Sequence, residues 1–170
     1  MTPATPDIDK LLRITACAVG VAGDEKDSVL AEVVGVLVRS KQLQPASRAG
    51  ALRALLERER VASTGVGLGV AIPHVQLRGL EQVACTLCVT SVPVPWQAHD
   101  GAGVRIVFGV LRPEKAGPRF DPQRHLELMR GIAQLGRDAD FRRFACGVTD
   151  RNALLALVRE TAQRLRDARN

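Results

Sequence analysis

The chain of 170 residues contains the stretch Ser63-Thr64-Gly65-Val66-Gly67-Leu68-Gly69-Val70-Ala71-Ile72-Pro73-His74. Alternate glycines allow a backbone to turn tightly and to bring its N–H groups close to an anion. Pro73 has a restricted φ, so the imidazole of His74 follows a stiff piece of backbone. A histidine presented in this way suits covalent chemistry on a ring nitrogen, metal binding or general base catalysis.

The segments around this stretch predict an α/β protein. A strand at residues 14–21 precedes a helix that begins at Gly23-Asp24, and Ser47 is expected to cap a second helix that ends near Arg60. Further strands are predicted at residues 70–72, 82–91 and 104–111, and further helices from Asp121-Pro122, Asp138 and Thr149. The order is one strand, two helices, three strands and three helices. It predicts a three-layer sandwich, with a mixed β-sheet covered by helices on both faces.

Two regions between these elements are expected to be loops. The residues Val92-Pro93-Val94-Pro95 interrupt regular strand pairing, so they are predicted to form a loop that carries Trp96. Asp100-Gly101 is a turn signal just ahead of the apolar run at residues 104–111. That run is nearly continuous, so it predicts a central strand buried on both faces.

Length and composition limit the organisation of the protein. A chain of this length is expected to form one domain over residues 1–170, with a flexible N-terminal segment at residues 1–10. No apolar run is long enough to span a bilayer, and the N-terminus lacks the pattern of a signal peptide, so a cytoplasmic location is expected. The net charge is +6, but the basic residues are scattered without interleaved aromatics, so nucleic acid is not an expected partner.

The Cys85-x-x-Cys88 motif raises the question of a redox or zinc site. It falls within the strand predicted at residues 82–91, where residues an odd number apart point to opposite faces. The two thiols then cannot share a metal ion, and the chain has no second cysteine pair. The motif therefore predicts reduced, buried cysteines.

Three further residues are candidates for a site with His74. His125 lies in the first turn of the helix after Pro122, where free N–H groups attract an anion; the alternative is a structural histidine. Arg58 precedes the glycine stretch and has the side chain best shaped for phosphate oxygens; the alternative is a solvated arginine at a helix end. His99 is interpreted as a surface turn residue.

The common nucleotide and hydrolase motifs do not fit. The glycine stretch follows a helix rather than a strand, and Val70 stands where a dinucleotide fingerprint needs its third glycine. The chain has no Gly-Lys-Ser/Thr sequence of a P-loop and no Gly-x-Ser-x-Gly elbow.

Several motifs accompany the glycine stretch that ends at His74. They are Leu56-Glu57-Arg58-Glu59, Asp100-Gly101, Leu111-Arg112-Pro113 and His125-Leu126. With these motifs the chain resembles the enzyme IIA proteins of the bacterial phosphoenolpyruvate-dependent sugar phosphotransferase system, in the fructose, mannitol and nitrogen-regulatory branch. The resemblance covers nearly the whole chain and agrees with the predicted layering.

The resemblance implies a phosphocarrier. His74 would accept a phosphoryl group from a histidine-containing phosphocarrier protein, His125 would help to hold or neutralise that group, and Arg58 would belong to the same pocket. The resemblance requires no metal, nucleotide or other cofactor. The predicted phosphate loop consists of five residues whose backbone N–H groups could approach the phosphoryl group: Ser63, Thr64, Gly65, Gly67 and Gly69.

The resemblance also implies partners. Beyond the donor, an enzyme IIB or a regulatory target protein would receive the signal or the phosphoryl group. Because these 170 residues include no transport domain, a regulatory role of the nitrogen type is expected ahead of a sugar-specific IIA component that serves a separate transporter. The related cytoplasmic fold of anion exchangers is a distant alternative, disfavoured by the intact motif.

One position departs from the family pattern. The family usually has glycine directly after the active histidine, and this chain has Val75. A β-branched residue resists a positive φ and crowds an approaching phosphate. The substitution therefore keeps open a second hypothesis, an interaction protein that retains the fold and signals without phosphoryl transfer.

Overall fold

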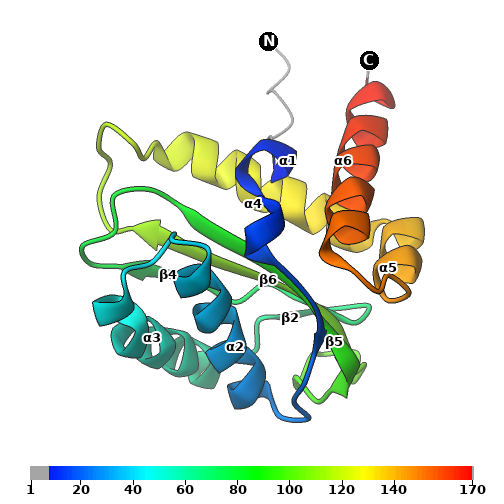
Figure 1. Ribbon diagram of the computed structural model, residues 1–170, viewed down its shortest axis with the longest axis horizontal. Coiled ribbons are helices and arrows are strands. Elements are labelled where there is room, and N and C mark those ends of the chain that lie inside the picture. The colour runs from blue at the N-terminus through cyan, green and yellow to red at the C-terminus, as the bar shows by residue number, and fades with distance from the viewer. Residues whose placement is uncertain (1–7, 170) are drawn as a thin grey trace.

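A computed structural model describes residues 8–169 and has the predicted architecture, in which one sheet lies between two layers of helices (Figure 1). The strands are β1 (Cys17–Val21), β2 (Gly65–Gly67), β3 (Val70–Ala71), β4 (His74–Leu77), β5 (Ala84–Val94) and β6 (Val104–Pro113). They form a six-stranded mixed sheet in the order β1-β5-β6-β3-β2, with β4 also paired to β6.

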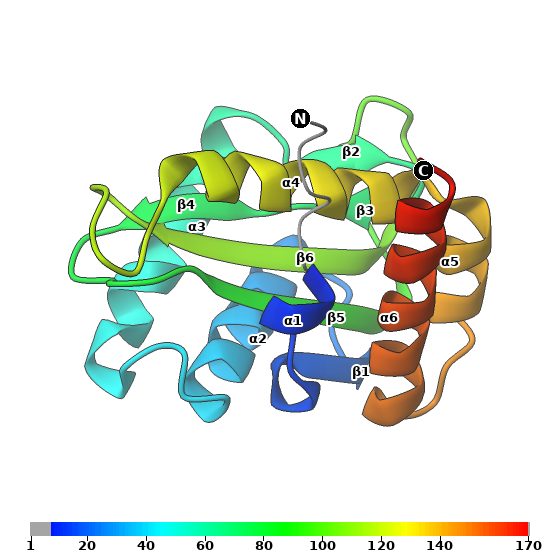
Figure 2. The ribbon, with the colours of Figure 1, turned by 90° about the horizontal axis from the view of Figure 1, so that it is seen from above.

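Helices cover both faces of this sheet, as predicted. The helices are α1 (Ile8–Leu11), α2 (Lys26–Arg39), α3 (Arg48–Val61), α4 (Pro122–Arg137), α5 (Ala139–Ala145) and α6 (Arg151–Asp167). Helices α1, α4, α5 and α6 pack on one face, and α2 and α3 pack on the other (Figure 2). Each face has its own apolar core, built mainly from aliphatic side chains.

Strand β6 is the central strand, as its apolar sequence predicts. It pairs antiparallel with β5 along one edge and parallel with both β3 and β4 along the other. Val70 is opposite Ile106 and His74 is opposite Val110, so β3 and β4 follow one another along the same edge of β6. The register of β6 therefore sets where His74 lies.

The strand predictions need three corrections. Residues 14–16 form a 3₁₀ turn, so β1 begins only at Cys17. Five strands follow α3 instead of three, because the glycine stretch itself forms the short hairpin of β2 and β3 and His74 begins another strand. Strand β5 continues to Val94, which pairs with Val104 after a shift of register, and this irregularity accommodates the proline that the prediction treated as a loop residue.

Two of the five predicted helix starts, at Asp121 and Asp138, are confirmed, and the start predicted at Gly23-Asp24 is corrected to Lys26, with Glu25 at the N-cap. Asp121 accepts a hydrogen bond from the backbone N–H of Gln123, and Asp138 accepts one from Phe141. The predictions for Ser47 and Thr149 are wrong. Ser47 makes no capping bond because a 3₁₀ turn leads directly into α3, and Asp150 caps α6 by accepting from Ala153.

The N-terminal segment that was expected to be flexible is described only from Ile8. Residues 8–10 belong to helix α1, whose Ile8 is buried in the core on the side of α6. The rest of that segment lies outside the described residues.

Candidate active site

His74 is held with one ring nitrogen engaged. Its Nδ1 lies 2.7 Å from the carbonyl oxygen of Ile72. A carbonyl oxygen only accepts hydrogen bonds, so Nδ1 carries the proton and Nε2 keeps a lone pair. The ring is half-buried at the start of β4, directly after Pro73. This arrangement leaves Nε2 as the nucleophilic atom of the ring.

His125 comes from helix α4 and lines the same cavity as His74. It lies in the first turn of α4, which passes over β4 in Figure 2. Its ring meets the edge of Phe120 at a centroid distance of 5.8 Å. Its Nδ1 is buried and finds no hydrogen-bond partner among the described residues. A buried polar nitrogen without a partner costs free energy, so its presence here favours a functional role.

The protonation of His125 is biased toward the neutral ring. Burial lowers the pKa of His125 below its ordinary value, and the positive charge of Arg112 and the ring of His74 lower it further. The neutral form therefore prevails at physiological pH. In that form one ring nitrogen donates a hydrogen bond and the other accepts one.

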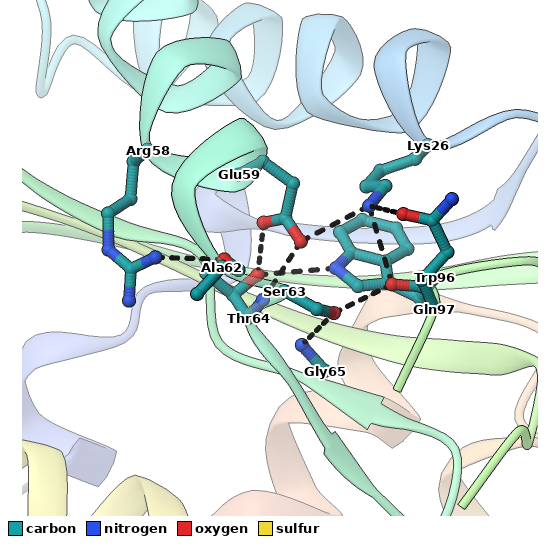
Figure 3. Close-up of polar contacts among 9 residues, drawn as sticks. All are labelled: Lys26, Arg58, Glu59, Ala62, Ser63, Thr64, Gly65, Trp96 and Gln97. Carbon is teal, nitrogen blue, oxygen red and sulfur yellow. Dashed lines mark hydrogen bonds and ion pairs between the residues drawn. The ribbon is translucent and has the colours of Figure 1, made fainter. Parts of the chain in front are cut away.

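Arg58 completes the predicted set from the last turn of α3. Its guanidinium donates from Nη1 to the carbonyl oxygen of Ala62 at 2.9 Å (Figure 3). Arg58, His74 and His125 line one open cavity of about 440 Å³. The structure thus brings together three residues that are far apart in the sequence. The other lining residues come from α3, β4 and β6: Ala54, Glu57, Val61, Val75, Gln76, Val110 and Arg112.

The five residues of the predicted phosphate loop are not among those that line the cavity. Thr64 is buried: its backbone N–H donates to Glu59 at 2.8 Å, and its hydroxyl donates to the same carboxylate. The hydroxyl of Ser63 donates to the carbonyl oxygen of Trp96 at 2.7 Å. The phosphate-binding role of the loop stays a prediction, and the first two of its residues have other partners.

These bonds belong to a buried network around Glu59 (Figure 3). Lys26 pairs with the Glu59 carboxylate at 3.4 Å, and the indole N–H of Trp96 donates to the Thr64 hydroxyl at 3.2 Å. Figure 3 shows Glu59 and the neighbouring Arg58 leaving the end of α3 in different directions. Glu59 therefore anchors the glycine stretch, and Arg58 lines the cavity.

The alternating glycines serve the tight β2–β3 hairpin. Gly67 has φ +87°, and a Cβ there would lie 3.1 Å from the carboxylate of Asp100. That carboxylate accepts a hydrogen bond from the backbone N–H of Leu68 at 2.8 Å. His99, next to Asp100, is exposed at the turn, as predicted.

Val75 does not strain the backbone. It lies in β4 opposite Leu111, and its φ is not positive. Its side chain is half-buried and packs against the core under α2 and α3. The concern that a β-branched residue would resist a positive φ at this position was therefore wrong, because the strand pairing keeps the residue extended.

Two residues that line the cavity were missed as site residues. Gln76 and Arg112 are register partners on β4 and β6, and Arg112 donates to the Gln76 side chain at 3.0 Å. Gln76 follows His74 on the same strand, and the pairing of β4 with β6 brings Arg112 beside Gln76. Predicting residues 74–77 as a strand paired with β6 would have pointed to both residues.

The cysteine prediction is confirmed. Cys85 and Cys88 are free, buried thiols in β5, and they belong to the apolar cores on opposite faces of the sheet. Burial raises the pKa of each thiol to about 12, so both are protonated and unreactive. Within residues 8–169, no group of three or more His, Cys, Asp or Glu side chains could hold a metal ion.

The fold, and a cavity lined by both His74 and His125, agree with the enzyme IIA class of proteins. The family model "Phosphoenolpyruvate-dependent sugar phosphotransferase system, EIIA 2" matches residues 11–161, and the chain belongs to this family. No helix in the described part of the chain is long and apolar enough to cross a membrane.

The relatives within this family include nitrogen regulatory proteins. A nitrogen regulatory protein of Pseudomonas aeruginosa is 33% identical over 135 residues, which cover 79% of this chain and 83% of the relative. The crystal structure of the nitrogen regulatory protein IIA-Ntr from Neisseria meningitidis matches with a TM-score of 0.77 and 28% identity, over 89% of this chain and 98% of that one.

A more distant structure shares the fold alone. It is the complex of the mannitol enzyme IIA with phosphorylated enzyme IIB from Escherichia coli, with a TM-score of 0.66 and 16% identity. The match covers 88% of this chain and 97% of that one.

Proposed function

We propose that this protein is a phosphocarrier that accepts a phosphoryl group on Nε2 of His74 from a histidine-containing phosphocarrier protein. The observation that carries this proposal is the bond between His74 Nδ1 and the Ile72 carbonyl, which leaves Nε2 free beside His125 and Arg58. Membership of the enzyme IIA family supports a role in phosphoryl transfer.

The transfer needs little covalent chemistry from the protein. The lone pair on His74 Nε2 forms the new N–P bond while the N–P bond to the donor's imidazole breaks, and the donor ring leaves with that electron pair. The reaction is an in-line displacement with a loose transition state, so placing the acceptor and stabilising the equatorial oxygens are the main requirements. The proton stays on His74 Nδ1 throughout, hydrogen-bonded to the Ile72 carbonyl oxygen. Arg58 and His125 supply hydrogen-bond donors for the oxygens.

The downstream role that we propose is regulatory and of the nitrogen type. The relatives from Pseudomonas aeruginosa and Neisseria meningitidis are both described as nitrogen regulatory proteins, which supports this choice over a sugar-specific one. The phosphorylation state would change which regulatory target the protein binds. An enzyme IIB is the alternative acceptor, and it would make the chain a sugar-specific component.

The direct test is the intact mass of the protein after incubation with phosphoenolpyruvate, enzyme I and the histidine phosphocarrier. Wild type is expected to gain one acid-labile phosphoryl group, and His74→Ala is expected to gain none. His99→Ala is the matched control, because His99 is exposed and does not line the cavity. An unmodified wild type beside a phosphorylated carrier would instead support a phosphate-independent binding protein.

A further inference from the structure

We propose that Arg112 is a second phosphoryl-binding arginine of this cavity, which faces the transferred group from the wall opposite Arg58 and is held in place by Gln76. This proposal rests on the proposed phosphocarrier function and adds a residue that the sequence motifs did not single out for that role. It predicts that two fixed guanidinium groups, rather than one, neutralise the phosphoryl oxygens.

The strand register places Arg112 next to the acceptor. His74 is opposite Val110 in the β4–β6 pair, and Gln76 is opposite Arg112 two residues further on. Alternate residues of a strand point to the same face, so these four side chains share one face of the sheet. All four line the cavity with His125.

Arg112 is oriented by neutral groups. Its Nη1 donates to the Pro113 carbonyl at 3.1 Å, and its Nη2 donates to Oε1 of Gln76 at 3.0 Å. The guanidinium lies 5.9 Å from the centroid of the Phe120 ring, which also contacts His125. These contacts use two of the five N–H donors of a guanidinium, and three remain for an anion.

Arg112 differs from neighbouring arginines in having no carboxylate partner among the described residues. Arginines on the loops after β4 and β6 and in the first turn of α4 each have a carboxylate partner, at 3.8, 3.4 and 3.9 Å: Arg78–Glu114, Arg119–Glu81 and Arg124–Asp121. Within the described residues, Arg112 and Arg58 contact carbonyl, amide or ring groups instead. A half-buried cation without a carboxylate partner attracts an incoming anion.

Because the His125 ring is mostly neutral, the arginines supply the positive charge for the phosphoryl group. Its ring is biased to the neutral form by burial and by the charge of Arg112. A neutral imidazole donates a hydrogen bond but contributes no net charge. Arginine stays protonated at all relevant pH values, so Arg58 and Arg112 are the fixed positive charges that line the cavity.

The test compares Arg112→Gln and Arg112→Lys with Arg119→Gln, an exposed arginine on the neighbouring loop that serves as the matched control. Transfer from the phosphorylated carrier is measured as kcat and KM. We expect Arg112→Gln to lower kcat by about 100-fold while KM changes little, because the arginine acts on the charge that is redistributed in the transition state. Arg112→Lys should recover part of the rate, and Arg119→Gln should match the wild type.

A second measurement does not depend on transfer. Inorganic phosphate is titrated into each variant while the ring signals of His74 and His125 are followed by NMR. Arg112→Gln is expected to bind phosphate at least about fivefold more weakly than the wild type, since it loses a charged donor. The same spectra should show the pKa of His125 rising toward its ordinary value in Arg112→Gln.

The two measurements separate the two proposals. A wild type that binds phosphate in an Arg112-dependent way but is not phosphorylated would contradict the proposed function alone. Equal phosphate affinity in wild type and Arg112→Gln, or an unchanged kcat in a transfer-competent Arg112→Gln, would overturn the role of Arg112. Urea unfolding of each variant excludes loss of the fold as the cause of a lower rate.

Discussion

Two polar clusters flank the segment that leads to His74, and they differ in how fully their hydrogen-bonding groups are used. At the start of the segment, the Glu59 carboxylate accepts from the Thr64 N–H, the Thr64 hydroxyl and Lys26. At its end, His125 has a buried Nδ1 without a partner in the described part of the chain. The first cluster is internally satisfied, and the second has donors and acceptors left over.

The difference separates a structural role from a functional one. A buried polar network with all its partners stabilises a local fold, and removing one member leaves the others unpaired. A cavity whose arginines pair with no carboxylate, and whose His125 has an unpartnered ring nitrogen, loses stability but can bind an anion. The Glu59 network should therefore respond to mutation in stability, and the cavity should respond in phosphoryl transfer.

The largest stability effect is expected from Glu59→Ala. The substitution leaves the Thr64 N–H and Lys26 without their carboxylate, and it should lower the free energy of unfolding by about 3 kcal/mol. Urea denaturation monitored by the fluorescence of Trp96, the single tryptophan, measures this directly. Glu57→Ala, on the exposed side of the same helix, should change stability by less than about 0.5 kcal/mol. Equal effects of the two substitutions would refute the structural role of the network.

Val75→Gly should have an intermediate effect. It places glycine inside β4 and removes a half-buried side chain, which should cost about 1–2 kcal/mol in the free energy of unfolding. Because Val75 is already extended, the rate of phosphoryl transfer should stay within about threefold of the wild type. A gain of tenfold or more would mean that valine impairs the site and would revive the interaction-protein hypothesis.

His125→Leu sharpens the contrast between the clusters. Leucine removes the unpartnered Nδ1 and keeps apolar contact with Phe120, so stability should be unchanged or rise by up to about 1 kcal/mol. Phosphoryl transfer should fall by about 100-fold or more, because a hydrogen-bond donor beside His74 is lost. A clear loss of stability would indicate that His125 is a structural residue after all.

The smallest expected effect is a pH dependence of stability. The pKa of His125 is lower in the folded protein than in the unfolded chain, so acidification through about pH 6.5 protonates the unfolded state first. His125 should therefore lower the stability of the wild type, relative to His125→Leu, as the pH falls through this window. Unfolding free energies of both proteins at pH 7.5 and 5.5 measure the difference. A constant difference across this range would show that the two states share one pKa.

The sequence predicted the layers of this fold because its apolar patterns are strong. The continuous run in β6 and the aspartates that begin α4 and α5 gave correct elements, and Cys85 and Cys88 were correctly placed on opposite faces. The prediction failed at short elements. Strands β2, β3 and β4 span only 3, 2 and 4 residues, which is too short for a periodic pattern.

The sequence also predicted only part of the candidate site. His74, His125 and Arg58 were selected as a set, and the structure brings them to one cavity. The glycine stretch forms a hairpin braced by Glu59 and Asp100, and its role in holding phosphate stays a prediction. The glycine pattern predicts a tight backbone without indicating which group approaches it, because a side chain of the protein can occupy that space as well as an anion.

The sequence alone determined the family, the order of layers and the histidine that we propose as acceptor, because these follow from local motifs and from apolar periodicity. Only the tertiary structure decided which nitrogen of His74 is free, that Val75 is unstrained, and that Arg112 faces the same cavity. The free nitrogen of His74 follows from its contact with the carbonyl of Ile72, two residues away. The other two features depend on the pairing of β4 with β6. Such contacts join residues that are distant in the chain, and no local pattern records them.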